Sequence, residues 1–223
     1  MPAAWTPRRF RLIVFDWDGT LADSTQLIAD CIQRACRDIG RPVPDDATAR
    51  YVIGLGLADM LRHIAPGLSA KGQVELTDRY RHHFLARDAE VPLFDGIREL
   101  LSDLDDVGFL LGVATGKSRA GLNRALLQHG IGHRFVVTRC ADEGFPKPHP
   151  DMLLNVMEQA GFDPDDTLMI GDTTHDLQLA RNAGTAAVAV AYGAHPPAGL
   201  TELDPLATVH SVAELHRWLR TNA

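Results

Sequence analysis

Charged and hydroxyl side chains follow the ends of several short apolar runs in this chain. They are Asp16, Asp18, Thr115, Lys147, Asp172 and Asp176. Several carboxylates in one crevice repel one another, and a divalent cation relieves that repulsion. Mg²⁺ prefers hard oxygen ligands and commonly binds a few carboxylates together with a substrate phosphate. These residue types therefore predict a magnesium site that receives a phosphorylated ligand, provided that the fold brings them together.

The side chains of this set have tasks that suit their types. Asp16 and Asp172 are the expected carboxylate ligands of the metal. A phosphoryl group between the metal and Lys147 would meet concentrated positive charge, and Thr115 can donate a hydrogen bond to a phosphoryl oxygen. Gly116 lets the backbone approach the ligand closely. We therefore expect Thr115, Gly116 and Lys147 to bind phosphate.

The apolar runs before these residues have the length and composition of buried strands. The first is Phe10–Phe15, and further strands are expected at Phe109–Ala114, Phe135–Thr138, Thr167–Gly171 and Ala186–Ala191. Helical patterns alternate with them, at Ile97–Leu104, from Ser118 to Gly130, and at Asp151–Ala160, Leu177–Ala183 and Val212–Leu219. This alternation predicts a parallel sheet that is covered by helices on both faces.

Residues 21–90 show helical spacing without strong strand runs, and turn residues interrupt them near Gly40, Gly54 and Pro66. We predict a doubly wound α/β core domain made of residues 1–20 and 91–223, with residues 21–90 inserted after the first strand as a helical domain. In open sheets of this kind the ligand binds beyond the carboxyl ends of the strands. That rule predicts that Asp16, Thr115, Lys147 and Asp172 converge.

The run Asp16-Trp17-Asp18-Gly19-Thr20 resembles the DxDGT motif of the haloacid dehalogenase-like (HAD) hydrolase superfamily. Thr115, Lys147 and the run from Gly171 to Asp176 match its three other motifs in order, so the resemblance spans the chain. The helical insertion resembles a C1-type cap. The stretches 92–96 and 147–150 resemble the phosphoglycolate phosphatase-like branch of subfamily IA. The resemblance implies a Rossmann-like core and a phosphatase that hydrolyses a small phosphomonoester.

The resemblance also implies the role of each residue. Asp16 would attack phosphorus and form an aspartyl-phosphate, while Asp18 would protonate the leaving alcohol and then activate water. Mg²⁺ would be held by Asp16, the backbone carbonyl of Asp18 and Asp172, with Asp176 supporting this shell. A small phosphorylated metabolite is the implied substrate, and phosphoglycolate is the nearest guess.

Other functions fit parts of the pattern. A phosphomutase resembling β-phosphoglucomutase, or a pyrophosphatase, would use the same fold, and the four motifs exclude neither. A phospho-receiver domain also has a strand-end Asp, but it needs neither Asp18 nor a cap-sized insertion. A haloacid dehalogenase generally lacks the second Asp of the DxD pair. A pure binding module would not need a complete acid/base and metal set.

The composition agrees with an enzyme of small ligands. The 223 residues have a formal net charge of −7 and no Lys/Arg block, so nucleic acid is not an expected partner. The sequence shows no apolar run long enough for a secretory signal or a membrane span. The three Cys residues, Cys31, Cys36 and Cys140, do not form a metal or disulfide pattern. We expect a cytoplasmic protein, monomeric or weakly dimeric.

Overall fold

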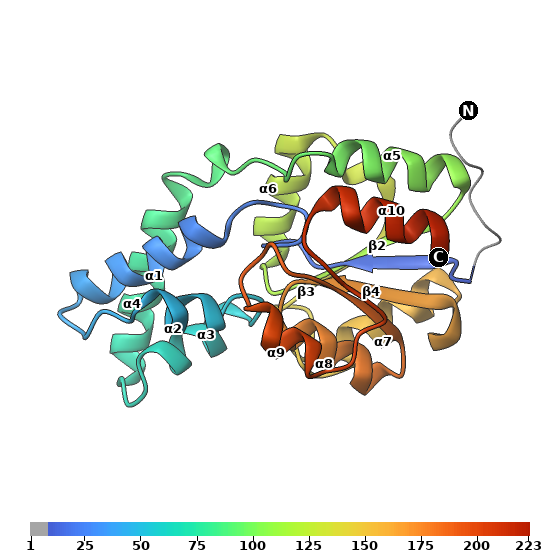
Figure 1. Cartoon of the computed structure of the whole chain (residues 1–223). Helices are drawn as coiled ribbons and strands as arrows, with labels where there is room; N and C mark the ends of the chain where they lie inside the picture. Colours follow the sequence, from blue (N-terminus) through green and yellow to red (C-terminus); the bar gives the residue numbers. More distant parts are fainter. Residues whose placement is uncertain (1–8) are drawn as a thin grey trace.

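The computed structural model describes residues 9–223 as a parallel sheet flanked by helices, with a helical unit at one end (Figure 1). The sheet has six strands in the order β3-β2-β1-β4-β5-β6. The strands are β1 Leu12–Phe15, β2 Leu110–Thr115, β3 Phe135–Cys140, β4 Thr167–Gly171, β5 Ala186–Val190 and β6 Thr208–Val209. All neighbouring pairs are parallel, which confirms the predicted class of sheet.

Helices cover both faces of this sheet because its strands are apolar on both sides. Ile13 and Phe15 of β1 belong to one hydrophobic cluster, together with residues of α5 Ile97–Val107, α6 Arg119–His129 and α10 Val212–Asn222. Leu12 and Val14 point to the opposite cluster, which contains residues of α7 Asp151–Ala160 and α8 Thr174–Ala183. The alternation of side chains along a strand thus gives the doubly wound arrangement that the sequence predicts.

The inserted segment forms the helices α1 Thr25–Asp38, α2 Asp46–Tyr51, α3 Leu57–Ile64 and α4 Ala70–Leu85. These helices have a hydrophobic cluster of their own, in which Ile32, Leu61 and Leu76 are buried. Among residues 9–223, the only buried member from the sheet part is Ala194. We call α1–α4 the helical unit; its own core confirms the predicted helices and turns of the insertion.

Two chain segments connect the helical unit to the sheet, and they run side by side (Figure 1). The Asp23 N–H donates to the Pro92 carbonyl, and the Phe94 N–H donates to the Leu21 carbonyl. Ala22 and Leu93 form an isolated antiparallel bridge between them. The predicted domain boundaries, before residue 21 and after residue 90, fall in or next to these connections. Residues 1–8 of the predicted core domain lie outside the described residues.

Some elements differ from the prediction. The helix α8 begins at Thr174, three residues before the predicted start, because Thr173 caps it. α9 Pro197–Thr201 and the two-residue strand β6 are not predicted from the sequence, since both are too short to show a period. Short 3₁₀ turns at Asp88–Glu90, Gly132–Arg134 and Pro164–Asp166 were likewise not predicted.

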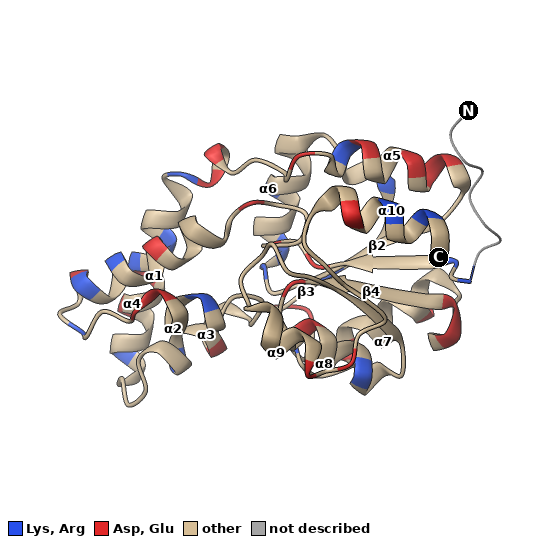
Figure 2. Ribbon diagram, in the orientation of Figure 1, with Lys and Arg blue, Asp and Glu red and all other residues tan. Residues whose placement is uncertain are grey.

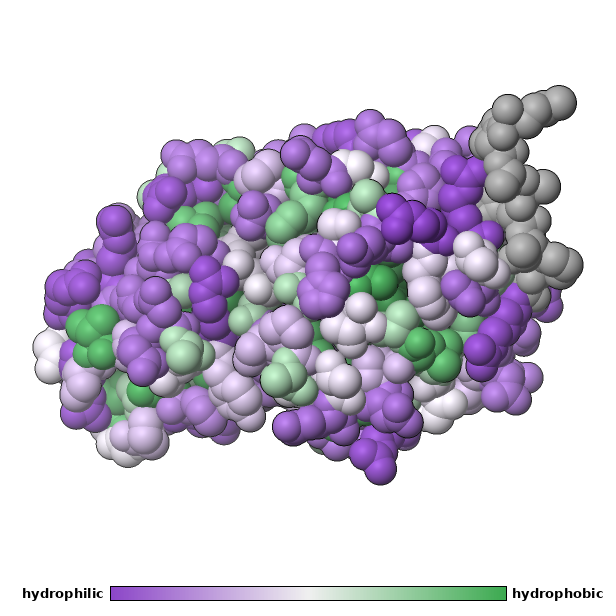
Figure 3. Space-filling view, in the orientation of Figure 1, coloured by the Kyte–Doolittle hydropathy of each residue, from purple (hydrophilic) through white to green (hydrophobic). Residues whose placement is uncertain are grey.

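Charged side chains of both signs are mixed along the helices. Lys and Arg alternate with Asp and Glu along the helices of both parts (Figure 2). The face in Figure 3 is mainly hydrophilic, with separate small hydrophobic patches. Within residues 9–223, no helix is long and apolar enough to cross a membrane.

Candidate active site

The candidate site lies beyond the carboxyl ends of the three central strands. Phe15 of β1 pairs with Val113 of β2 on one side and with Ile170 of β4 on the other. Asp16 therefore leaves the middle strand between the ends of its two neighbours. Thr115 comes from one neighbour and Asp172 from the other, as the strand-end rule predicts.

Lys147 reaches this point from the loop between β3 and α7. Its Nζ lies 2.6 Å from Asp16 Oδ1 and 2.6 Å from Asp176 Oδ1, and all three side chains are buried. Burial by itself would lower the pKa of Lys147, but the two carboxylates raise it above its ordinary value. The lysine is therefore a fixed positive charge at the bottom of the site.

Three buried carboxylates surround this one lysine. Asp16, Asp172 and Asp176 each offer an oxygen, and these oxygens lie within 4.8 Å of one another. Burial raises the pKa of Asp16 to about 7, with Lys147 opposing the rise. Burial also raises the pKa of Asp172 well above its ordinary value, and the charge of Asp16 adds to the effect. One ammonium cannot balance three carboxylates, so the cluster lacks positive charge.

An unpaired atom shows where further positive charge would fit. Asp16 Oδ2 is buried and has no hydrogen-bond partner in the part of the chain that the structure describes. An unpaired carboxylate oxygen beside two further carboxylates is a suitable ligand for a hard divalent cation. The donor set is all oxygen, which suits Mg²⁺. The residues present therefore fit the metal that the sequence predicts.

Asp172 is held from two sides. Its Oδ1 accepts a hydrogen bond from Thr20 Oγ1 at 2.8 Å, and its Oδ2 accepts one from the Ala194 N–H at 2.7 Å. Gly19 has a φ of +85°, and a Cβ at this position would overlap the Asp172 carboxylate. Glycine therefore suits this position of the DxDGT run for two reasons. It adopts the left-handed backbone conformation, and it leaves room for the Asp172 carboxylate.

Asp176 has two functions in the structure. With Thr173 it forms a capping box at the start of α8, and it also pairs with Lys147. One side chain serves both functions because the first turn of α8 points into the site.

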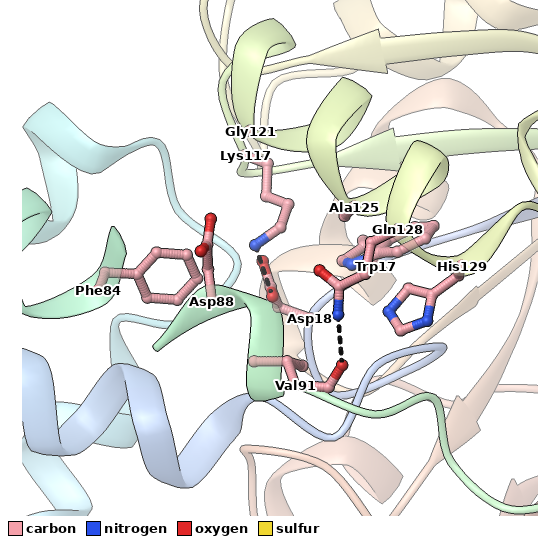
Figure 4. A pocket seen from close by; sticks show the side chains of 10 residues that line it. All are labelled: Trp17, Asp18, Phe84, Asp88, Val91, Lys117, Gly121, Ala125, Gln128 and His129. Carbon is pink, nitrogen blue, oxygen red and sulfur yellow. Dashed lines mark hydrogen bonds and ion pairs between the residues drawn. The ribbon is translucent and has the colours of Figure 1, made fainter. Parts of the chain in front are cut away.

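Asp18 bonds to residues outside the three-carboxylate cluster. Its Oδ1 accepts hydrogen bonds from Ser24 Oγ at 2.7 Å and from Lys117 Nζ at 2.9 Å. Figure 4 shows Lys117 reaching across to Asp18, next to Phe84 of the helical unit, whose ring centroid lies 4.9 Å from the Lys117 Nζ. The Asp18 side chain thus lies where the sheet part meets the helical unit.

Thr115 and Gly116 form the loop next to this lysine. Thr115 is buried, and its Oγ1 accepts a hydrogen bond from the Lys117 N–H at 3.2 Å. Among the described residues no direct bond joins Thr115 to Asp16 or Lys147. A Cβ at Gly116 would lie 2.6 Å from the carbonyl oxygens of Gly54 and Leu55. The absence of a side chain at Gly116 therefore allows the Gly54–Leu55 turn of the helical unit to pack against this loop.

The sequence reasoning missed the residues that hold the charged groups. Ser24 and Ala194 contact Asp18 and Asp172, yet a serine near a helix start and an alanine in a loop carry no distinctive signal. Lys117 follows Gly116 just before a helix, where a cation is commonly exposed, yet its side chain is only 12% exposed. Arg119, its neighbour, instead pairs with Glu143 outside the carboxylate cluster.

Comparison with known proteins places the chain among enzymes. The family model described as haloacid dehalogenase-like hydrolase matches residues 13–190. The chain is 34% identical over 210 residues to the probable phosphatase IndB of Dickeya dadantii, covering 92% of this chain and 91% of that protein. It is 32% identical over 226 residues to a phosphoglycolate phosphatase of Vibrio vulnificus, covering 94% and 96% of the two chains.

The fold is likewise similar to a solved structure. The crystal structure of a predicted phosphatase from Clostridium acetobutylicum superposes with a TM-score of 0.82 at 27% sequence identity. The superposition covers 93% of this chain and 97% of the other. The similarity therefore includes both the sheet and the helical unit.

Proposed function

The chain belongs to the haloacid dehalogenase-like hydrolases, and from this premise we propose that it is a magnesium-dependent phosphatase of a small phosphomonoester. The observation that carries the proposal is the buried, unpaired Oδ2 of Asp16 beside Lys147 and two further carboxylates. A carboxylate that is fixed at one oxygen and free at the other can bind a cation or attack phosphorus. The relatives named as phosphatases support this reading.

In the first step an oxygen of Asp16 attacks phosphorus, and the bond from phosphorus to the leaving oxygen breaks. Lys147 holds the attacking carboxylate in place and faces the phosphoryl charge. Asp18 donates a proton to the leaving alkoxide, so that a neutral alcohol departs. Ser24 and Lys117 hold the Asp18 carboxylate in position for this transfer.

In the second step water hydrolyses the aspartyl-phosphate. Asp18 takes the proton of the attacking water, inorganic phosphate leaves, and the Asp16 carboxylate is restored. When bound, Mg²⁺ would neutralise charge on the phosphoryl oxygens. Asp16, Asp172 and the Asp18 backbone carbonyl would hold it, and Asp176 would support that shell through its place in the carboxylate cluster. Thr115 and Gly116 would line the phosphoryl site beside Lys147.

We further propose that residues 21–90 act as a cap domain on the core formed by residues 1–20 and 91–223. The separate hydrophobic cluster of α1–α4 and the paired connections support this division. A cap that closes over the strand ends suits a small ligand and excludes water during transfer. Phosphoglycolate is the first substrate to test, because a relative bearing that activity in its name aligns along nearly the full chain.

A panel of phosphorylated metabolites, with and without Mg²⁺, tests the proposal. We expect free phosphate from the wild type with Mg²⁺, and none above background from Asp16→Asn or after removal of the metal. Asp23→Asn is the matched control, since Asp23 lies near the site but is exposed. Full activity of Asp16→Asn would refute the covalent route, and an isomeric sugar phosphate as product would instead identify a mutase.

A further inference from the structure

One backbone carbonyl of the helical unit receives two hydrogen bonds from the core. It belongs to Tyr51, the last residue of α2, where a helix leaves carbonyls without an intrahelical partner. His175 Nε2 and His195 Nε2 each lie 2.9 Å from this oxygen. The two imidazoles come from different elements, α8 and the loop after β5, and converge on a single acceptor.

The hydrogen-bond network indicates which ring nitrogen donates in each case. His195 Nδ1 accepts from the Thr174 N–H at 3.1 Å, so the hydrogen of a neutral ring lies on Nε2. A carbonyl accepts only, so His175 Nε2 also donates. The Tyr51 ring lies against both imidazoles. It stacks on His195 with the ring centroids 5.3 Å apart, and it lies edge-on to His175 with the centroids 5.4 Å apart. Packing and hydrogen bonding therefore act at the same place.

The segments that carry these two histidines also hold the charged groups of the site. The His195 N–H donates to the Asp172 carbonyl at 3.3 Å, and the preceding Ala194 N–H donates to the Asp172 carboxylate. His175 lies directly before Asp176 in the first turn of α8. A shift of either histidine would therefore act on a carboxylate of the cluster through only one or two residues of chain.

Within the helical unit, Tyr51 lies shortly before the Gly54–Leu55 turn, which packs on the loop of Thr115 and Gly116. The carbonyls of Gly54 and Leu55 approach Gly116 so closely that a Cβ there would not fit. Gly54 in turn lies against Thr173, which caps α8. Fixing the Tyr51 carbonyl therefore fixes where this turn rests on the core.

We propose that His175 and His195 are positioning residues that hold the cap closed through the Tyr51 carbonyl and so couple cap closure to the Asp172 and Asp176 segments. This inference rests on the proposed function for its kinetic consequence, but the closure itself is measurable without any substrate. Because the two donors share one acceptor, loss of one leaves the other in place. Loss of both should cost more than the two single losses together.

Paired spin labels on Val74→Cys and Leu127→Cys measure cap closure. Val74 lies on α4 and Leu127 on α6, both are exposed, and the three native cysteines are buried. We expect the double variant His175→Phe/His195→Phe to raise the open fraction of the cap by about tenfold, which corresponds to the net contribution of at least one hydrogen bond. Each single Phe variant should raise the open fraction far less. His175→Gln and His195→Gln keep a donor and should restore the closed distance.

Two controls separate the hydrogen bonds from general packing. His63 is exposed and its ring lies 5.5 Å from the Tyr51 ring without bonding to the carbonyl, so His63→Phe should leave the distance unchanged. Tyr51→Leu removes the ring but keeps the carbonyl, and it should open the cap less than the double Phe variant. An unchanged distance in the double variant, or equal opening by Tyr51→Leu, would overturn the inference.

Kinetics with p-nitrophenyl phosphate and Mg²⁺ complete the test. We expect the double Phe variant to raise KM about tenfold with a smaller fall in kcat, because a population shift toward the open state lowers apparent affinity. The Gln variants should recover most of this loss. If the wild type hydrolyses no phosphomonoester, the proposed function fails while the distance measurement still decides the role of the histidines. A variant whose cap is more open but whose KM is unaltered would show that cap closure is not coupled to the site.

Discussion

The sheet part and the helical unit each bury an apolar core, but they differ in where their charged side chains lie and what these bond to. In the sheet part, Asp16, Lys147, Asp172 and Asp176 are buried. Lys147 donates to Asp16 and Asp176, and Asp172 accepts from Thr20 and from the Ala194 N–H. In the helical unit, charged side chains such as Arg50 and Arg62 bond to neighbours on the helices themselves. Buried charge is costly unless it is paired or binds a metal, so its location marks the part of the molecule that is built for chemistry.

The two parts therefore contribute to function by different physical means. The sheet fixes its charged groups from several strand ends at once, and none of them can move without leaving a partner unpaired. The helical unit contacts the surroundings of the site through backbone atoms at Tyr51 and the Gly54–Leu55 turn, and through the Phe84 ring beside Lys117. Charge at the strand ends should therefore govern catalytic rate, and the helical unit should govern access and affinity.

The largest effect should follow from removal of the central cation. Lys147→Ala leaves Asp16 and Asp176 without their shared partner, so we expect a loss of about three orders of magnitude in kcat. Steady-state hydrolysis of p-nitrophenyl phosphate measures it. Arg119→Ala removes a cation that pairs with Glu143 instead, and it should change little. Comparable losses in both variants would mean that general charge, rather than the fixed lysine, drives the rate.

The next effect separates the two hydrophobic cores. Ile32 is fully buried in α1, and Ile32→Ala should destabilise the helical unit by about 2–5 kcal/mol through loss of packing. Hydrogen exchange should rise in α1–α4 while β1, β2 and β4 stay protected. Ile170→Ala, in the sheet, is the matched variant and should raise exchange across the whole molecule. Equal loss of protection everywhere in Ile32→Ala would argue against a separate cap domain.

A smaller effect should come from crowding the contact between the two parts. Gly116→Ala places a methyl group 2.6 Å from two carbonyl oxygens of the Gly54–Leu55 turn, so the turn must lift. We expect KM to rise about tenfold, the size of an overpacking cost of roughly 1–3 kcal/mol. At Gly199 the nearest atom to an added Cβ is 3.8 Å away, so Gly199→Ala should leave KM unchanged. An unchanged KM in Gly116→Ala would show that closure tolerates the methyl group.

The last effect concerns stability rather than catalysis, through its dependence on pH and metal. Because burial raises the pKa of Asp16 to about 7, the folded state binds a proton that the unfolded state releases near pH 4. This contribution to stability is fully present below the unfolded pKa and is lost as pH rises through about 7. Without metal, Tm should therefore fall between about pH 5 and about pH 8.

Magnesium should reverse this fall because it takes the place of the proton. Calorimetry with and without Mg²⁺ should show a larger rise in Tm at about pH 8 than at about pH 5. Asp16→Asn, which has no proton to lose at this position, should flatten part of the metal-free profile. An Mg²⁺ effect that is equal at both pH values would contradict competition between proton and metal at Asp16.

The sequence allowed the longer strands and helices of the core, and the residues at the strand ends, to be predicted because each depends on a local pattern. The predicted strand Phe10–Phe15 is present as Leu12–Phe15, and the predicted helix Asp151–Ala160 has the same bounds in the structure. The contacts of Lys117, Ser24 and Ala194 depend on distant pairings that no local pattern encodes. The convergence of His175 and His195 on Tyr51 is of the same kind, since it joins three segments through one backbone atom.

The most direct test of the central claim is to find the phosphoryl group on Asp16. After an acid quench of Asp18→Asn mixed with p-nitrophenyl phosphate and Mg²⁺, peptide mass spectrometry should show one phosphoryl group on Asp16. The acid/base for the second step is missing in this variant, so the intermediate should accumulate. Asp16→Asn should show neither the adduct nor turnover. A phosphoryl group on another residue, or undiminished phosphate release by Asp16→Asn, would contradict the account.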